Sequence, residues 1–503
     1  MRRTGLPLEL GPVSNGEYAP PRSGPVAAEA ARRAVRAVED GVRRTGLSRR
    51  DFLAWCGTAT VLAALTACSR EEAATRTTAT TRPPTSAPSS TTATTARAAT
   101  TAAPATSTEP GGTFEVPEAA TTEPEAAAEV LGGDELVVDV QTHLLEYDLT
   151  QPLGDYWGSG FPQAACGLDD ARACFGIDQW QQLVLDGSDT SVAVLSAVPV
   201  VADPSPLSTD VMERARDQAA EAGCDGRVLI QGEAFPTTGP PEAVFEGMAA
   251  LAAAHDIAAW KTYTHVGSGW FLDDHDPDAP QVGQAFIDQI RALGVPRLAV
   301  HKGFGGSRFA SPVDIGPAAA ANPDIDFLVY HSGYQPGVAE GPFDPAAPNE
   351  GVDRLLASLA GVGIGAGGNV HAELGSTWFN VLRDPTEAAH VLGKLLVALG
   401  PNNVLWGTDS IWYGSPQPQI EAFRTFQISS ELQDQFGYPA LTDEIRRGVL
   451  GGNAARLHGL EPATVQCAPP SADERAAGAS PALGPATAVE ARAVFTAAHP
   501  WWA

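Results

Sequence analysis

The sequence predicts an α/β fold, with a (β/α)8 barrel of the TIM type over residues 131–460 of the 503-residue chain. Short runs of apolar and β-branched residues alternate there with segments of helical pattern, and the alternation gives eight strands with intervening helices. The segment also has the length of one barrel domain, which needs ~250 residues or more. We therefore expect parallel strands joined by helices that cover their outer side.

Each expected strand is a short apolar run, and each expected helix is a longer segment with apolar residues on one face. The strands are expected at 136–141, 191–199, 226–232, 257–263, 296–301, 325–330, 362–373 and 402–408. Helices are expected between them at 177–186, 208–222, 241–254, 281–293, 349–359 and 385–398. Two further helices, at 417–428 and 441–458, are expected to close the domain.

Residues 1–67 have the organisation of an export signal. The segment Ser48-Arg49-Arg50-Asp51-Phe52-Leu53 resembles the twin-arginine motif, and a modestly apolar run follows it. This run is shorter than the ~20 residues that a membrane-spanning helix needs. It ends in Leu65-Thr66-Ala67-Cys68, which resembles a bacterial lipobox. The alternative is a short buried helix that starts at Arg49.

The lipobox predicts a lipoprotein of the cell envelope, held on the extracytoplasmic face of the membrane by a lipid anchor at Cys68. Residues 68–130 are rich in Thr, Ala and Pro, which predicts a disordered linker, and residues 461–503 form an Ala/Pro-rich tail. In an oxidising compartment, Cys166 with Cys174 and Cys224 with Cys467 are candidate disulfides. Free buried thiols are the alternative.

The charge of the chain excludes one class of partner. The formal net charge is −28, and residues 1–67 hold ten Arg and six Asp or Glu, so residues 68–503 carry −32. Such a surface repels phosphate, so we expect no nucleic-acid partner. The expected partner is a small-molecule substrate, and the sequence leaves monomer and homodimer open.

Polar side chains stand where the expected strands end. Asp139-Val140-Gln141-Thr142-His143 belongs to the first strand, and alternation places Asp139, Gln141 and His143 on one face. Later strands end near Lys261, His301, His331 and Asp409. Because the carboxyl ends of barrel strands meet at one mouth, these side chains predict an active site there.

The pattern resembles the amidohydrolase superfamily, more narrowly the amidohydrolase-related (amidohydrolase 2) branch that includes aminocarboxymuconate-semialdehyde decarboxylase. The matching segments are Asp139-Val140-Gln141-Thr142-His143, Lys261, Val300-His301, Tyr330-His331-Ser332-Gly333, Asn369-Val370-His371-Ala372-Glu373, Leu405-Trp406-Gly407-Thr408-Asp409 and Gly451-Gly452-Asn453-Ala454-Ala455-Arg456-Leu457. The resemblance covers roughly residues 134–460.

The resemblance implies that His143 and His301 bind one divalent metal ion, and that Asp409 binds it too or shares a proton with metal-bound water. It implies that His331 is an acid or base near the metal. The first histidine of the family's Asp-x-His-x-His pattern is Gln141 here. Zinc is the first expectation, but an amide oxygen is a weaker zinc ligand than imidazole, so Gln141 as a ligand would admit harder ions.

The implied activity is hydrolysis of a C–N or C–O bond in a small amide, lactone or ester by metal-activated water. Asp409 would accept the water's proton, His331 would orient the water or protonate the leaving group, and Lys261 would bind an anionic group. Trp412 and Tyr413 would line the pocket. Two alternatives are a non-oxidative decarboxylase, which an arginine such as Arg308 at the mouth would favour, and a binding protein that has lost catalysis.

Overall fold

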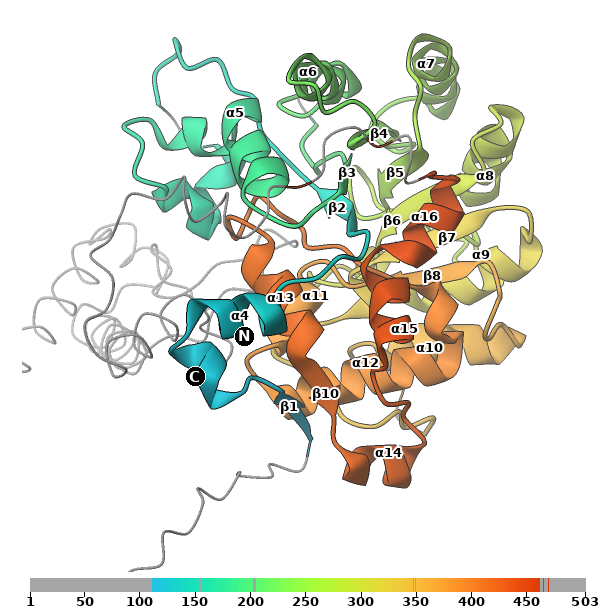
Figure 1. Cartoon of the computed structure of the whole chain (residues 1–503). Coiled ribbons are helices and arrows are strands. Elements are labelled where there is room, and N and C mark those ends of the chain that lie inside the picture. Colours follow the sequence, from blue (N-terminus) through green and yellow to red (C-terminus); the bar gives the residue numbers. More distant parts are fainter. Residues whose placement is uncertain are drawn as a thin grey trace, which may run out of the picture. The chain divides into compact units, whose positions relative to one another are not determined.

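The computed structural model describes residues 111–461, except 154–155, 202–204, 347 and 349, and also residues 465 and 469. Eight parallel strands follow one another in chain order around a nearly closed barrel (Figure 1). They are β2 (Val138–Thr142), β3 (Val192–Leu195), β4 (Val228–Glu233), β5 (Ala259–Tyr263), β6 (Arg297–His301), β7 (Asp326–Tyr330), β8 (Val370–Glu373) and β9 (Val404–Leu405). The predicted (β/α)8 barrel is confirmed.

The barrel closes between β2 and the chain after β9. The N–H of Val140 donates to the carbonyl of Trp406 at 3.1 Å, and the N–H of Asp409 donates to the carbonyl of Gln141 at 2.9 Å. A single parallel bridge joins Thr142 to Ser410. The first and last strands of the barrel are therefore neighbours at its mouth.

The core inside the barrel consists of small and branched apolar side chains. Its buried members are Val138, Val140, Val192, Val194, Ala299, Leu328, Tyr330, Leu405 and Ala454. Strands that are covered on both faces read as continuous apolar runs, which is why these segments were recognisable in the sequence. The Tyr330 hydroxyl donates to the carbonyl of Val140 at 2.5 Å, so the polar end of the largest core side chain is satisfied.

Helices surround the strands in Figure 1. Those of the repeat are α5 (Ile177–Trp180) with a π-helical extension to Asp186, α6 (Thr209–Glu221), α7 (Pro241–Ala254), α8 (Gly283–Ala292), α9 (Ile315–Ala321), α10 (Asp353–Val362) and α12 (Pro385–Leu399). The others are α4 (Pro124–Leu131), α11 (Thr377–Val381), α13 (Gln417–Thr425), α14 (Ser430–Phe436), α15 (Asp443–Arg447) and α16 (Asn453–His458).

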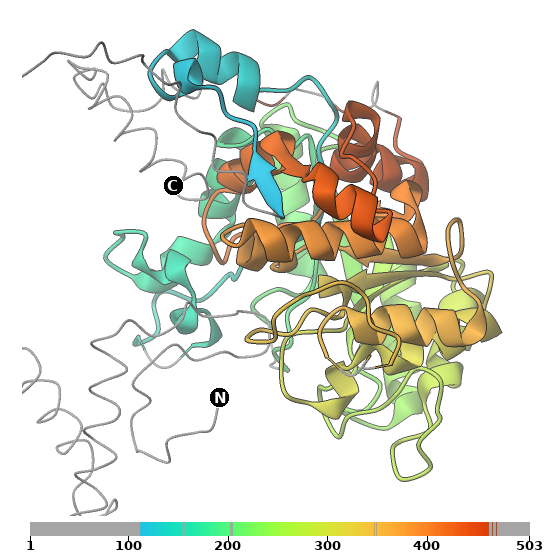
Figure 2. The ribbon, with the colours of Figure 1, turned by 90° about the horizontal axis from the view of Figure 1, so that it is seen from below.

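The sequence prediction was wrong at the edges of the domain. The linker was expected to run to residue 130, but β1 (Gly112–Phe114) and α4 lie within it. The helix expected at 417–428 ends at Thr425, because Phe426–Ile428 forms β10 and pairs antiparallel with β1. Figure 2 shows β1 lying beside α12. A partner strand distant in sequence therefore overrides the local helical pattern.

Two other boundaries differ for local reasons. The seventh strand was expected at 362–373, but only Val370–Glu373 is extended, and α10 continues to Val362. Gly363 ends that helix in the left-handed conformation, with φ of 78°. The short helices α9, α11 and α14 were not predicted, since few residues give no clear period.

The cysteines were predicted correctly where they can be seen. Cys166 and Cys174 form a disulfide. Cys224 is also disulfide-bonded, but its expected partner Cys467 lies outside the described residues, as do Cys68 and the whole expected signal. Within the described part of the chain, none of the helices has both the length and the apolar character needed to cross a membrane.

A buried lysine forms ion pairs that connect α12 with α10 and with the loop after β7. Lys394 of α12 donates to Glu340, which lies in the loop after β7, and to Asp353 Oδ1 at the start of α10, 2.7 Å away. Lys394 and Glu340 are 3% and 6% exposed. Removing one member of such a pair leaves an uncompensated buried charge.

We expect Lys394→Met to lower the free energy of unfolding by about 3–5 kcal/mol, measured by urea denaturation. Arg291→Met is the control: this half-exposed arginine pairs with Asp288 and Asp324, and its loss should cost less than about 1 kcal/mol. Equal losses in the two variants would contradict this account of the pair.

Candidate active site at the carboxyl ends of the strands

The barrel brings the predicted polar residues to its carboxyl end. His143 directly follows β2, His301 ends β6, His331 follows β7, and Asp409 lies four residues beyond β9. Lys261 lies in the middle of β5 rather than at its end. All five side chains are fully buried. Their arrangement is set by hydrogen bonds that also fix where each proton lies.

His143 presents a lone pair to the site. Its Nδ1 lies 2.7 Å from the carbonyl oxygen of Ser196, and because a carbonyl only accepts, Nδ1 carries the proton. Nε2 is therefore an acceptor. It lies 3.0 Å from Asp409 Oδ1 and 3.3 Å from Gln141 Nε2. Burial lowers the pKa of His143, so the ring favours its neutral form.

Asp409 lies opposite that lone pair. Its Oδ1 accepts from Gln141 Nε2 at 2.9 Å and from Trp412 Nε1 at 3.2 Å, and its Oδ2 accepts from the Ser376 hydroxyl. Burial by itself would raise the pKa of Asp409, but the contacts with His143 and His331 in their protonated forms and the hydrogen bond from Ser376 outweigh it and keep the pKa below its usual value. Asp409 is therefore a carboxylate.

His301 and His331 form a second pair. His331 Nδ1 donates to the carbonyl of Gly375 at 2.8 Å, so its Nε2 accepts from His301 Nδ1 at 3.1 Å. This order leaves the lone pair of His301 on Nε2. Burial lowers the pKa of His331 to about 4 and that of His301 well below its usual value, so both rings are neutral at pH 7.

The expected role of His331, to orient the water or protonate the leaving group, stays a prediction. Both of its ring nitrogens are engaged in hydrogen bonds, and burial lowers its pKa to about 4. Its backbone N–H donates to Glu373 Oε2 at 2.9 Å, and its φ of 67° holds the chain in a left-handed turn. His331 is a positioning residue for His301.

The ammonium of Lys261 lies against aromatic rings. Its Nζ is 3.9 Å from the ring centre of Tyr330 and 4.5 Å from that of Tyr263, which are cation–π distances. Its charge contributes to the lowered pKa of His143, of His301 and of His331. Lys261 therefore shares the electrostatic environment of these histidines, although it lies in the middle of β5.

Aromatic side chains cover the other side of the site. Trp412 stacks on His143 with ring centres 5.2 Å apart, and Phe161 stacks on Trp412 at 4.5 Å. Trp157 meets Trp412 edge-on at 4.9 Å. Tyr413 stacks on Phe379 at 3.8 Å and shares a hydrogen bond with Ser376. The predicted placement of Trp412 and Tyr413 beside the site agrees with these contacts.

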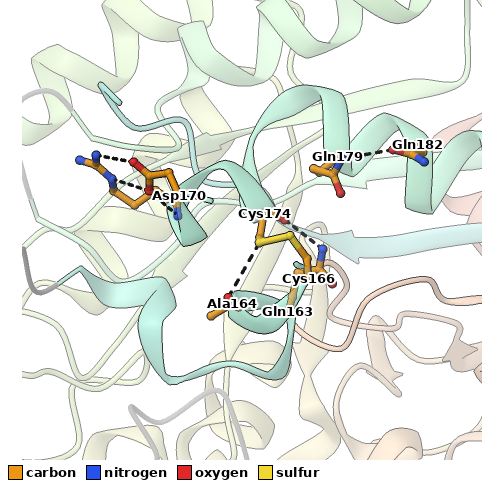
Figure 3. The surroundings of a disulfide bond; sticks show 8 residues. Gln163, Ala164, Cys166, Asp170, Cys174, Gln179 and Gln182 are labelled. Carbon is orange, nitrogen blue, oxygen red and sulfur yellow. Dashed lines mark hydrogen bonds and ion pairs between the residues drawn. A yellow bond between two sulfur atoms is a disulfide. The ribbon is translucent and has the colours of Figure 1, made fainter. Parts of the chain in front are cut away.

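The segment that carries Phe161 is held by the disulfide. Figure 3 shows Cys166 bonded to Cys174 next to Gln163, whose Nε2 donates to the carbonyl of Cys174 at 3.0 Å. The N–H of Gln163 donates to the carbonyl of Trp412 at 3.1 Å. We call residues 157–175 the aromatic cap. The disulfide links two parts of the aromatic cap, and the hydrogen bond of Gln163 links the cap to Trp412, which stacks on His143.

Two of the expected ligands, His143 and Asp409, form a donor set that fits a metal ion. His143 Nε2 and Asp409 Oδ1 are both acceptors and lie 3.0 Å apart, and a cation between them removes their repulsion. His301 as a third ligand stays a prediction. Within the described residues, the one His/Cys/Asp/Glu group of three with all ligand atoms within 4.8 Å is Asp210, Glu213 and His255 on the surface.

A family model for amidohydrolases matches residues 138–460. The chain belongs to the amidohydrolase family. The match begins at the first residue of β2 and ends after α16, so it spans the whole barrel. No curated protein matches this amidohydrolase.

Solved structures with a similar course of the chain are distant. A 2,6-dihydroxybenzoate decarboxylase with 2,6-dihydroxybenzoate is 13% identical, covers 65% of this chain and 98% of its own, and has a TM-score of 0.37. A 5-carboxyvanillate decarboxylase from Novosphingobium aromaticivorans, with manganese and a nitrobenzoic acid, is 12% identical, covers 66% and 97%, and has a TM-score of 0.39.

A Xaa-Pro dipeptidase with bound methionine is also similar, at 12% identity and a TM-score of 0.34, covering 65% of this chain and 76% of its own. At such identities and TM-scores, these likenesses carry no argument about the substrate of this amidohydrolase.

Several groups of the site had no signal in the sequence. Ser196 acts through its backbone carbonyl, which any residue offers. Ser376 reaches Asp409 from a left-handed turn with φ of 53°. Phe161 acts from a loop that lies far from the strand ends in the sequence. Arg308 points elsewhere: it is exposed and paired with Asp276, so it does not mark a carboxylate site.

We expect a Cys166→Ser/Cys174→Ser variant to loosen the aromatic cap without unfolding the barrel. Amide hydrogen exchange of residues 157–175, followed by mass spectrometry, should rise by about tenfold or more, because a closed loop of this kind contributes ~2–4 kcal/mol. Exchange of α6, which touches neither cysteine, is the internal control. Unchanged exchange in the cap would show that the aromatic contacts alone hold it.

Proposed function

We propose that this amidohydrolase is a metal-dependent enzyme that removes the carboxyl group of a small planar acid by non-oxidative decarboxylation. The buried ammonium of Lys261, whose charge acts on His143 of the His143–Asp409 pair, carries the proposal. The expected lipid anchor at Cys68 would place the reaction on the extracytoplasmic face of the membrane.

The charges of the site favour an anionic substrate. Lys302 pairs with Asp314, whose Oδ2 lies 2.8 Å from its Nζ, and the ammonium of Lys261 lies over the rings of Tyr263 and Tyr330. Burial raises the pKa of Glu373 well above its usual value, so that carboxyl favours its neutral form. A divalent cation beside Asp409 would add positive charge to the site, which a substrate carboxylate can balance.

The walls favour a flat substrate. Trp412, Tyr263 and Phe304 surround the histidines, with Phe304 4.9 Å from the ring of His331. Aromatic faces and edges at such separations accept a planar ring in stacked or edge-on geometry. Enclosure also excludes water, which favours a reaction that turns a carboxylate into neutral CO2.

Different residues of the site would bind the carboxylate and protonate the carbon in this decarboxylation. A divalent cation held by His143 and Asp409 would supply positive charge that binds and orients the carboxylate. Lys261 donates a proton from Nζ to the carbon that bears the carboxylate. The new C–H bond forms, the C–C bond breaks with its electron pair returning to the substrate, and CO2 leaves. The neutral histidines orient groups but do not supply this proton.

Hydrolysis of an amide, lactone or ester is the second candidate. One observation favours it: Asp409 is a carboxylate with a pKa below its usual value, directly beside the position where a cation fits. Such a group is suited to accept a proton from water and to pass it to the leaving group. In this reaction Lys261 would bind an anionic part of the substrate instead of acting as the acid.

We expect the full chain, loaded with metal, to release CO2 from hydroxylated aromatic carboxylates in preference to hydrolysing amides, lactones or esters. In D2O the product should carry one deuterium at the carbon that lost CO2, which NMR detects. Lys261→Met should lower kcat by on the order of 10²–10⁴, the usual contribution of a general acid.

Lys261→Arg is the matched variant, since it keeps the charge but is a far weaker acid, so it should bind a carboxylate inhibitor while remaining slow. Activity confined to amides, lactones or esters, abolished by Asp409→Asn, would instead establish the hydrolase. A chain that holds metal yet converts no member of either panel would favour a binding protein.

A further inference from the structure

We propose that Glu233, the last residue of β4, is a proton relay, whose carboxyl group takes a proton from solvent and passes it to the amine of Lys261 after each turnover. This inference rests on the proposed decarboxylation and deepens it, because it names the route by which the consumed proton is replaced. It also gives a role to a buried acidic group that has no other part in the proposed reaction.

Decarboxylation with a lysine as the acid consumes one proton per turnover. The ammonium of Lys261 gives its proton to carbon and is left as a neutral amine, which cannot act as an acid again until it is protonated. Lys261 is fully buried, as are the two histidine pairs and Asp409. A side chain that lies between Lys261 and solvent can supply the missing proton.

Glu233 lies beside Lys261 in the barrel wall. The two residues are register partners in the parallel pair of β4 and β5, and neighbouring strands run about 4.8 Å apart. Two residues earlier, Gln231 donates to the hydroxyl of Tyr330 in the barrel core at 2.7 Å, so this face of β4 points inward. Alternation places the side chain of Glu233 on the same face. Lys261 also points inward, since its Nζ lies over the ring of Tyr330.

The carboxyl group of Glu233 reaches from the buried site toward solvent. Its Oε2 is buried and has no hydrogen-bond partner among the described residues, whereas the residue as a whole is only half-buried. A buried acceptor without a donor costs about 1–3 kcal/mol. Protonation of the carboxylate, or a hydrogen bond from an ammonium group, removes that cost. Glu233 is therefore placed both to gain a proton and to give one up.

The acidity of Glu233 suits a relay at neutral pH. Burial raises its pKa to about 7, so the carboxyl and the carboxylate are both populated there. A group with a pKa near the working pH accepts a proton from water and passes it on without a large barrier in either step. His265 is also half-buried and lies beside His301, but its pKa is lowered to about 4, so its protonated form is scarce at pH 7.

Lys261 is the charged group that the neighbouring strands bring to Glu233. It comes from β5 at the register position of Glu233. On the other side, β3 consists of the apolar residues Val192–Leu195, and Ser196 follows them. The chain after β4 continues with the uncharged Ala234 and Phe235. A cation beside a carboxylate stabilises its charged form, so the state of Lys261 should affect the proton affinity of Glu233.

The protons and electrons balance over one cycle. A hydronium ion gives a proton to the carboxylate of Glu233 and becomes water. The O–H bond of Glu233 then breaks as a new N–H bond forms on the amine of Lys261. Lys261 gives a proton to the substrate carbon, the C–C bond breaks with its electron pair returning to the substrate, and CO2 leaves. One carboxylate and one proton have become CO2 and a C–H bond.

The first test separates the first turnover from those that follow it. Metal-loaded full chain is mixed rapidly at pH 7 with the aromatic carboxylate that it converts fastest, and released CO2 is followed over time. Because Lys261 begins protonated, Glu233→Gln should release one CO2 per chain at the wild-type rate. Its later turnovers should be slower by about tenfold or more, with KM unchanged. Imidazolium, added as a small acid, should restore the later rate.

Glu213→Gln is the matched control, because Glu213 is a half-buried glutamate of α6 that pairs with Arg216 away from the barrel mouth. It should behave like the wild type and should not respond to imidazolium. A first turnover of Glu233→Gln that is as slow as the later ones, or a later rate that imidazolium does not change, would show a structural role for Glu233 and overturn the relay.

A second measurement needs no turnover. Infrared difference spectra between the wild type and Glu233→Gln isolate the carbonyl stretch of the protonated Glu233 carboxyl, whose titration should have its midpoint at about pH 7. Lys261→Met should move this midpoint to higher pH, because it removes the cation beside the carboxylate. A midpoint that Lys261→Met leaves unchanged would overturn the pairing of the two groups.

Failure of the proposed function is distinguishable from failure of this inference. A wild-type chain that releases no CO2, but in which Glu233 titrates and responds to Lys261→Met as described, refutes decarboxylation and supports the proton pair. A wild-type chain that decarboxylates, with the same rate in all turnovers of Glu233→Gln, refutes the relay alone.

Discussion

The closure of the barrel between β2 and the chain after β9 is the constraint on which the rest of the structure depends. The carboxylate of Asp139 accepts the N–H of Thr408 at 3.0 Å, the hydroxyl of Thr408 and the N–H of Gln141 at 3.1 Å. Burial raises the pKa of Asp139 to about 7, although these three bonds oppose the rise.

The register of this closure determines whether a site exists. A slip of one residue between neighbouring strands moves a side chain by ~3.3 Å and turns it to the other face. The contact between His143 and Asp409 spans only 3.0 Å, so such a slip would separate them completely. Asp139 is therefore as necessary to the site as the residues that line it, although it faces the backbone of Thr408 and not the substrate.

The barrel and the position of its site could be predicted from the sequence. Parallel strands buried on both faces form continuous apolar runs, and the functional residues of barrels lie at the carboxyl ends of the strands. His143, Lys261 and Asp409 were found in that way. The roles of the histidines could not be predicted, since which nitrogen carries a proton depends on carbonyls such as those of Ser196 and Gly375. The pairing of β1 with β10 could not be predicted either, because it joins segments about 300 residues apart in the sequence.

The disulfide of the aromatic cap has a thermodynamic consequence for binding. A loop that must become ordered when a ligand arrives subtracts its lost conformational entropy from the affinity. Here the bond between Cys166 and Cys174, together with the stacking of Phe161 on Trp412, restricts that loop before any ligand is present. The enzyme meets its substrate with this wall already in place, and the binding energy of a small molecule remains for the reacting bond.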